Sequence, residues 1–204
     1  MKTIELKKKS VELEVCKAMF ELCKRAGKEG KKVMEMIHYN SELKRLEATD
    51  GRAALTYGVQ IDGLEENAFF SLSGNYLIQV ENTSNWDFPA IQRVIPDLEK
   101  PLVRNYFNLG EISFSAKTIS VEGELCGLLG SVGVRVSGIY TGLIKSCIEQ
   151  FSFLALCEES VGEVATGRPV LFHGAGINYV VMPMNNTWAE ARIPADDDTA
   201  KKTA

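Results

Sequence analysis

The chain has 204 residues, of which 45% are apolar, 25% are charged and 8% are aromatic. This composition is typical of a globular protein that buries its own core, and it excludes collagen-like, disordered and disulfide-scaffold classes. No apolar run approaches the ~20 residues of a membrane-spanning helix. The lysine-rich start lacks the apolar stretch of a signal peptide. We therefore expect a cytoplasmic protein that makes no membrane contact.

The cysteines predict the same compartment. They form no C-x-x-C pair, which argues against a zinc site or a thioredoxin-like motif. Each lies beside apolar residues, so we expect buried free thiols that pack as small hydrophobic side chains. The five cysteines are Cys16, Cys23, Cys126, Cys147 and Cys157.

Charge is distributed unevenly along the chain. The net charge is -4, but residues 1–32 hold ten basic and five acidic residues and are therefore positive by five. The remaining 172 residues carry a charge of -9. A basic first segment on an acidic protein predicts one local contact with an anionic partner, although a solvated helix face would give the same run.

The first predicted element is a helix over residues 10–27. Ser10 can cap its N-terminus, apolar residues from Val11 to Ala26 recur at helical spacing, and Gly27 can end it. The opposite face carries basic residues that could contact phosphates. These candidate DNA-binding residues are Lys17, Lys24, Arg25 and Lys28.

Strands are predicted after this helix, separated by turn-forming pairs such as Asn40-Ser41 and Asp50-Gly51. Residues 82–101 are rich in Pro, Asn and Asp and predict a long loop. The expected strands in this half are residues 32–39, 42–49, 53–61, 68–71 and 76–80.

The second half predicts short strands around one helix, residues 139–151. Residues 127–138 are glycine-rich without the Lys-Ser/Thr of a phosphate-binding loop, and they predict a tight turn or bulge with a strand at 132–136. The polar residues 187–204 predict a disordered tail. The other expected strands are residues 111–114, 118–122, 153–157, 169–172 and 179–182.

The order β-α-β-β-β therefore occurs twice, at residues 1–60 and 132–184. Runs of antiparallel strands with helices on one face predict an α+β fold. We divide the chain into an N-terminal part (1–97), a C-terminal part (98–186) and the tail (187–204).

Catalytic chemistry is hard to find in this sequence. The two histidines, His38 and His173, have no Ser, Cys or carboxylate at the spacing of a triad or a metal site. Asp50 could carry a catalytic carboxylate, but an aspartate in a hairpin turn is usually structural. We predict no enzyme, no metal and no cofactor.

Three segments resemble the bacterial DNA polymerase III β subunit, the sliding clamp. They are Ala48–Arg52 (ATDGR), Phe88–Pro96 (FPAIQRVIP) and Tyr179–Met184 (YVVMPM), and they occur in the same order as in that family. The β-α-β-β-β pattern is also the half-domain unit of clamps. The resemblance thus implies a DNA-clamp-like α+β fold.

In that family the three segments build an apolar groove for short peptides of polymerases and clamp loaders. A floor of methionines adapts to different apolar partners, and arginines donate to peptide carbonyls or carboxylates. A core strand end at residues 180–184 is the alternative interpretation. The residues implied are Thr49, Gly51, Arg52, Pro89, Arg93, Val94, Val180, Met182, Pro183 and Met184.

The resemblance also implies that the basic helix contacts double-stranded DNA without reading its sequence, inside a ring of self-associated chains. Lys145 is the only basic residue that the second helix offers, and the chain is much shorter than a three-domain clamp. The sequence therefore supports two hypotheses: a reduced processivity factor that assembles into a homo-oligomeric ring, or a clamp-like peptide-binding adaptor or decoy that never encircles DNA.

Overall fold

A computed structural model describes residues 1–81, 83, 85–95, 103–109, 121–131, 134, 136–157 and 169–183. Side chains of residues 103–108 and 153–157, and some in 121–131, are outside this description. The predicted strand 111–114 and the tail lie outside the described residues, so neither prediction is tested.

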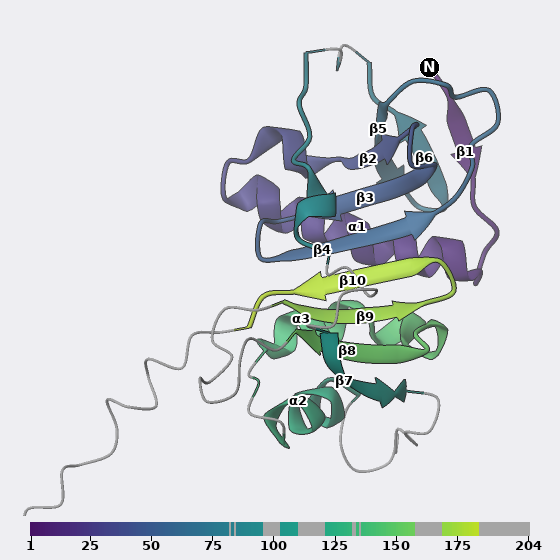
Figure 1. Cartoon of the computed structure of the whole chain (residues 1–204). Helices are drawn as coiled ribbons and strands as arrows, with labels where there is room; N and C mark the ends of the chain where they lie inside the picture. The colour runs from purple at the N-terminus through teal and green to yellow at the C-terminus, as the bar shows by residue number, and fades with distance from the viewer. Residues whose placement is uncertain are drawn as a thin grey trace, which may run out of the picture.

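The described strands form one antiparallel sheet of ten strands (Figure 1). Its order is β1-β6-β5-β2-β3-β4-β10-β9-β8-β7. The pairing of β4 with β10 joins the two halves of the chain into one sheet, with Leu55 opposite Tyr179. The strands are β1 (Thr3–Glu5), β2 (Ile37–Asn40), β3 (Arg45–Thr49), β4 (Ala53–Gly58), β5 (Ala68–Ser73), β6 (Tyr76–Gln79), β7 (Val103–Asn108), β8 (Phe153–Cys157), β9 (Val170–Gly174) and β10 (Ile177–Val181).

The predicted basic helix is α1 (Val11–Lys28), and it packs on the sheet against β2, β3, β4 and β5. Ser10 caps it as predicted, because its hydroxyl accepts a hydrogen bond from the Leu13 N–H at 3.3 Å. Met19 and Leu22 on its inner face are fully buried. Gly27 does not end the helix: α1 runs one residue further, and Gly30 (φ +75°) takes the left-handed conformation that glycine favours.

The side chains of the central strands divide between two faces, as alternation along a strand requires. In β2, Ile37 and Tyr39 belong to the core beneath α1. His38 lies between them and so points to the opposite face, which is the face that the segment 86–93 covers.

Three sequence-based assignments in the first half need correction. The strand expected at 53–61 ends at Gly58. Residues Lys32–Glu35 form a 3₁₀ turn, η1, and the strand that follows starts only at Ile37. Residues 42–44 form a turn in which Lys44 has φ +48°, so β3 begins at Arg45. Apolar side chains at Val33 and Met34 gave these residues a strand-like pattern, although they pack beside α1 as a turn.

The second half departs further from the sequence-based assignments. Residues Val121–Ser131 form helix α2, where we expected the end of a strand and a glycine-rich turn. Val134 and Val136 are buried but belong to no strand. The predicted helix 139–151 is instead α3 (Gly138–Leu143) followed by the 3₁₀ helix η4 (Lys145–Gln150). Strand β7 was not predicted.

The predicted division into parts 1–97, 98–186 and 187–204 stays a prediction. The core is continuous across the first two parts, because η4 packs against α1 and one buried cluster holds Leu22 and Leu55 together with Phe172 and Tyr179. The β4–β10 pairing places the 48–52 turn next to the end of β10.

Candidate functional site

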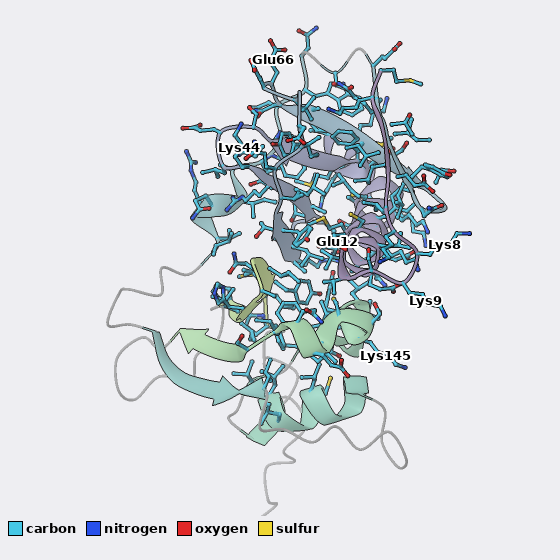
Figure 2. The ribbon with its side chains drawn as sticks, turned by 90° about the vertical axis from the view of Figure 1, so that its right-hand side faces the viewer. Lys8, Lys9, Glu12, Lys44, Glu66 and Lys145 are labelled. Carbon is cyan, nitrogen blue, oxygen red and sulfur yellow. The ribbon has the colours of Figure 1, made fainter. Side chains whose placement is uncertain are left out.

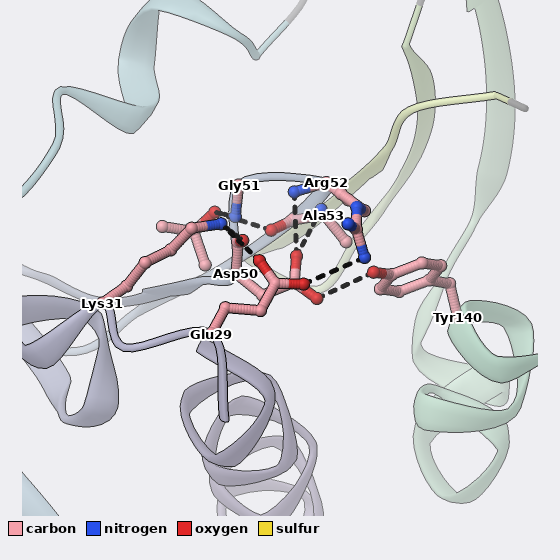
Figure 3. A network of polar contacts seen from close by, with 8 residues as sticks. Glu29, Lys31, Asp50, Gly51, Arg52, Ala53 and Tyr140 are labelled. Atoms are coloured by element: carbon pink, nitrogen blue, oxygen red, sulfur yellow. Dashed lines mark hydrogen bonds and ion pairs between the residues drawn. The ribbon is translucent and has the colours of Figure 1, made fainter. Parts of the chain in front are cut away.

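The turn between β3 and β4 is built by its own polar side chains (Figure 3). The carboxylate Oδ1 of Asp50 accepts hydrogen bonds from the N–H groups of Arg52 and Ala53, each at 2.9 Å. Thr49 Oγ1 accepts from the Gly51 N–H at 3.0 Å and donates to the Ala53 carbonyl at 2.7 Å. Gly51 has φ +89°, a conformation that disfavours any side chain. Thr49, Asp50 and Gly51 of the ATDG motif therefore each have a structural role in this turn.

Contacts from both halves of the chain hold this turn in place. Asp50 is buried, and its second carboxylate oxygen accepts from the Tyr140 hydroxyl of α3 at 2.8 Å. Burial, and then this hydrogen bond to Asp50, raises the pKa of Tyr140. Lys31 donates to the Asp50 carbonyl at 2.6 Å. Asp50 is thus a structural residue of the turn, as an aspartate in a hairpin turn usually is.

The end of β10 is attached to the same turn. The Met182 N–H donates to the Arg52 carbonyl at 2.8 Å, directly after the last residue of β10. Buried Tyr179 donates from its hydroxyl to the Tyr140 carbonyl at 2.8 Å. The YVVMPM segment therefore lies against the ATDGR segment, although they are about 130 residues apart in the sequence.

The segment that carries the FPAIQRVIP motif is anchored to the sheet face opposite α1. Phe88 stacks on the His38 ring, with the centroids 4.6 Å apart. Arg45 Nη1 donates to Gln92 Oε1 at 2.7 Å. His38 in turn contacts Glu47 (Nδ1 to Oε2, 2.9 Å), and both side chains are buried. His38 thus serves to position this segment.

Electrostatics stabilise this anchor. Burial acts to raise the pKa of the Glu47 carboxyl, but hydrogen bonds from His38 and Arg45 outweigh it and hold that pKa below its usual value. Arg45 lies 2.6 Å from Glu47 through both Nε and Nη2. Glu47 is therefore ionised at neutral pH, and its charge is compensated within the fold.

The three segments meet around an apolar cavity of about 240 Å³. Seven of the ten residues predicted for the peptide groove line it: Thr49, Gly51, Arg52, Pro89, Val94, Val180 and Met182. Val94 and Met182 are large apolar side chains that are 46% and 39% exposed. Exposed apolar side chains around a hollow are typical of a surface that binds a partner.

The other three predicted residues do not line this cavity or cannot be placed. Arg93 is exposed in the 3₁₀ turn η2 (Ile91–Arg93), and Pro183 is half-buried beyond the end of β10. Met184 lies outside the described residues. Sequence reasoning missed Met34, Ala53, Ala54, Ala90 and Ile91, which also line the cavity.

The candidate DNA-binding residues share one side of α1. Lys17 and Lys24 are exposed and each pairs with a glutamate three residues earlier, Glu14 at 2.8 Å and Glu21 at 2.6 Å. Arg25 is half-buried against the Tyr140 ring, and Lys28 is exposed. Lys8 and Lys9, just before α1, and Lys145 in η4 also extend outward (Figure 2). The basic face is therefore real, but part of its charge is neutralised by neighbouring carboxylates.

The part of the chain that the structure describes carries neither a metal-binding cluster nor a membrane-spanning helix. No group of three His, Cys, Asp or Glu side chains there could hold a metal ion. No helix there is long and apolar enough to cross a membrane. Cys16, Cys23 and Cys147 are buried free thiols, as predicted, and burial raises the pKa of each to about 12. Cys126 is free but only half-buried, and the side chain of Cys157 lies outside the description.

Comparison with solved structures decides the fold. The sliding clamp of Bacillus subtilis superposes over 90% of this chain and 63% of its own, with a TM-score of 0.50 and 10% identity. A putative DNA polymerase III β subunit from Eubacterium rectale superposes over 91% of this chain and 66% of its own, with a TM-score of 0.50 and 9% identity. The fold is that of a bacterial sliding clamp. The chain spans about two thirds of the length of these clamps.

A sliding clamp from Helicobacter pylori, determined with a DNA ligase peptide bound, is also similar, at 10% identity and a TM-score of 0.48 over 90% of this chain and 65% of its own. No protein-family model and no curated protein matches the sequence. The α+β, clamp-like fold expected from the three motifs is confirmed, and the roles of the motif residues stay predictions.

Proposed function

We propose that this sliding-clamp-like chain binds short linear peptides of DNA polymerases or clamp loaders in the apolar cavity described above. One observation carries the proposal: three segments that are distant in the sequence, 49–54, 89–94 and 180–182, line a single apolar cavity. Its lining is predominantly apolar, and Arg52 at its edge supplies donors for a peptide carbonyl.

The test is a titration of a fluorescein-labelled ten-residue peptide that carries a Leu-Phe pair in a Gly/Ser/Gln background. We expect saturable binding that weakens at least tenfold in Met182→Ala, because the side chain removed is part of the cavity lining. Leu43→Ala is the matched control, since Leu43 is similarly exposed (46%) but lies elsewhere. Equal affinity in both variants, or no binding at all, would refute the groove.

We further propose that the chain acts as a processivity factor, contacting double-stranded DNA through the basic side of α1 and assembling head to tail into a ring. The exposed Lys17, Lys24 and Lys28 on one side of α1 support a sequence-independent phosphate contact. In the described sheet, β1 and β7 are the terminal strands. A terminal strand offers unpaired N–H and C=O groups to another chain, so copies could pair through these edges. Such a role needs no catalytic residue and no cofactor.

A clamp-like adaptor or decoy is the second candidate, and the ion pairs of Lys17 and Lys24 favour it because they reduce the positive field. Charge reversal at Lys17, Lys24 and Lys28 separates the two. A processivity factor would lose stimulation of processive DNA synthesis, while an adaptor would retain its peptide affinity and show no stimulation before or after the change. Light scattering that gives a monomer at high concentration would contradict the ring.

A further inference from the structure

A second cavity, of about 230 Å³, lies on the other side of the 49–52 turn. We call it the basic pocket. Its walls carry four cationic side chains, three carboxylates and the Tyr140 ring. The cations are Lys24, Arg25, Lys28 and Arg52.

All three carboxylates of the basic pocket are already engaged. Asp50 accepts from two backbone N–H groups and from the Tyr140 hydroxyl. Glu29 pairs with Lys31 at 2.8 Å and with Arg52 at 3.0 Å, and these two neighbours lower its pKa. Glu21 pairs with Lys24 at 2.6 Å. The donors to Asp50 are neutral, so its charge still offsets one cation, and four cations against three carboxylates leave the pocket with a net charge of +1.

Arg25 and Lys28 are the cations that remain. The Nε atom of Arg25 is buried and has no hydrogen-bond partner among the described residues. Its guanidinium carbon lies 5.7 Å from the centroid of the Tyr140 ring, which holds the group at the pocket wall. Lys28 is exposed and forms no ion pair with any described residue. A buried donor without an acceptor costs free energy until a ligand supplies one.

The basic pocket and the apolar groove share a wall. Arg52 lines both, and the same turn places Asp50 in the pocket and Gly51 in the groove. An extended peptide advances roughly 3.3 Å per residue. A peptide with an apolar side chain in the groove therefore brings a residue only a few positions away to the pocket.

From this arrangement we infer that the basic pocket binds the carboxylate of an Asp or Glu side chain that flanks the apolar anchor of the bound peptide. The inference rests on the proposed function and specifies the partner: an apolar-acidic peptide. A guanidinium offers parallel N–H donors that match a carboxylate, and Lys28 adds a point charge. The other occupant with suitable chemistry is a DNA phosphate, which the experiment distinguishes.

The test moves one Glu through each flanking position of the labelled Leu-Phe peptide and compares it with Gln at the same position, at 0.15 M salt. We expect Glu to lower the Kd about tenfold at one position. In the double variant Arg25→Gln/Lys28→Gln, we expect this preference to disappear: the Kd of the Gln peptide divided by the Kd of the Glu peptide falls below two. Arg25→Lys keeps the charge but loses the paired N–H donors of the guanidinium, and we expect it to give an intermediate ratio of the two Kd values. Lys8→Gln is the control with the ratio unchanged, because Lys8 is exposed and lies outside the pocket.

The outcomes separate this inference from the proposed function. If every Gln and Glu peptide binds equally, the groove stands and the acidic specificity is wrong. The same conclusion follows if the Glu preference survives in the double variant, or if a 20-base-pair duplex is the only ligand whose affinity depends on Arg25. If no peptide binds, both proposals are wrong. Thermal denaturation of each variant checks that it is folded.

Discussion

Tyr140→Phe is the sharpest test of how the two halves of the chain build the site. The substitution removes only the hydroxyl that donates to Asp50 at 2.8 Å, and it leaves a carboxylate oxygen of a buried residue without that donor. A hydrogen bond to a charged group contributes roughly 1.5–3 kcal/mol. We therefore expect the free energy of unfolding to fall by about 2 kcal/mol, since little rearrangement is open to the buried turn.

The assay is urea denaturation followed by circular dichroism, with a double-mutant cycle through Asp50→Asn. The cycle should give a coupling energy of about 1–2 kcal/mol between the two side chains. Tyr76→Phe is the matched control, because the Tyr76 hydroxyl contacts Glu5 at 3.3 Å on the exposed surface. Its loss should stay below about 0.5 kcal/mol. Equal effects of the two tyrosine substitutions, or no coupling to Asp50, would refute the reasoning.

The same contact predicts a pH dependence. A tyrosine whose pKa is raised by folding holds its proton more tightly in the folded state, so its stabilisation is full below the ordinary pKa of 10.0. That stabilisation is lost as the pH rises above 10. Between pH 9 and 11, Tyr140→Phe should therefore lose less stability than the unaltered protein, in which the Tyr140 hydroxyl must ionise on unfolding. Parallel declines would contradict the Asp50 contact.

Two further predictions concern the packing of the sheet and helices. A Cβ at Gly174 would lie 2.3 Å from the Ser152 backbone nitrogen, so Gly174→Ala should destabilise the fold by about 2–3 kcal/mol. Gly127 in α2 has open space around it, so Gly127→Ala should stabilise the fold by roughly 0.5–1 kcal/mol. Equal denaturation midpoints of the two variants would contradict this packing. With a pKa of about 12, only about one in ten thousand of the Cys16, Cys23 and Cys147 thiols is ionised at pH 8. Iodoacetamide should therefore label them only after unfolding, and rapid labelling of the native protein would show that they are accessible.

The sequence is informative where the structure is local. Helix α1 follows from a capping serine and a regular apolar stripe. The 48–52 turn follows from an aspartate that accepts hydrogen bonds from nearby backbone N–H groups and a glycine that adopts a positive φ. These features depend on neighbours within a few residues. They could be predicted because local hydrogen bonding and periodicity decide them.

Contacts between distant segments could not be predicted in this way. Tyr140 completes the turn from 90 positions away, and nothing in the pattern around it indicates Asp50 as its partner. Helix α2 escaped prediction because Gly123, Gly127 and Gly130 interrupt its apolar pattern. Met34 was missed because a short turn with two apolar residues resembles a strand. The three motifs identified most of the groove only through their joint resemblance to clamps.

The most direct test of the central claim locates the bound peptide. A Leu-Phe peptide with benzophenone in place of the Phe ring is crosslinked to the full chain, and the product is digested and sequenced by mass spectrometry. The groove predicts crosslinks to Met34, to residues 89–94 and to Met182, competed by unlabelled peptide. Crosslinks confined to residues around His38 and Leu43, which do not line the groove, or scattered without competition, would contradict it.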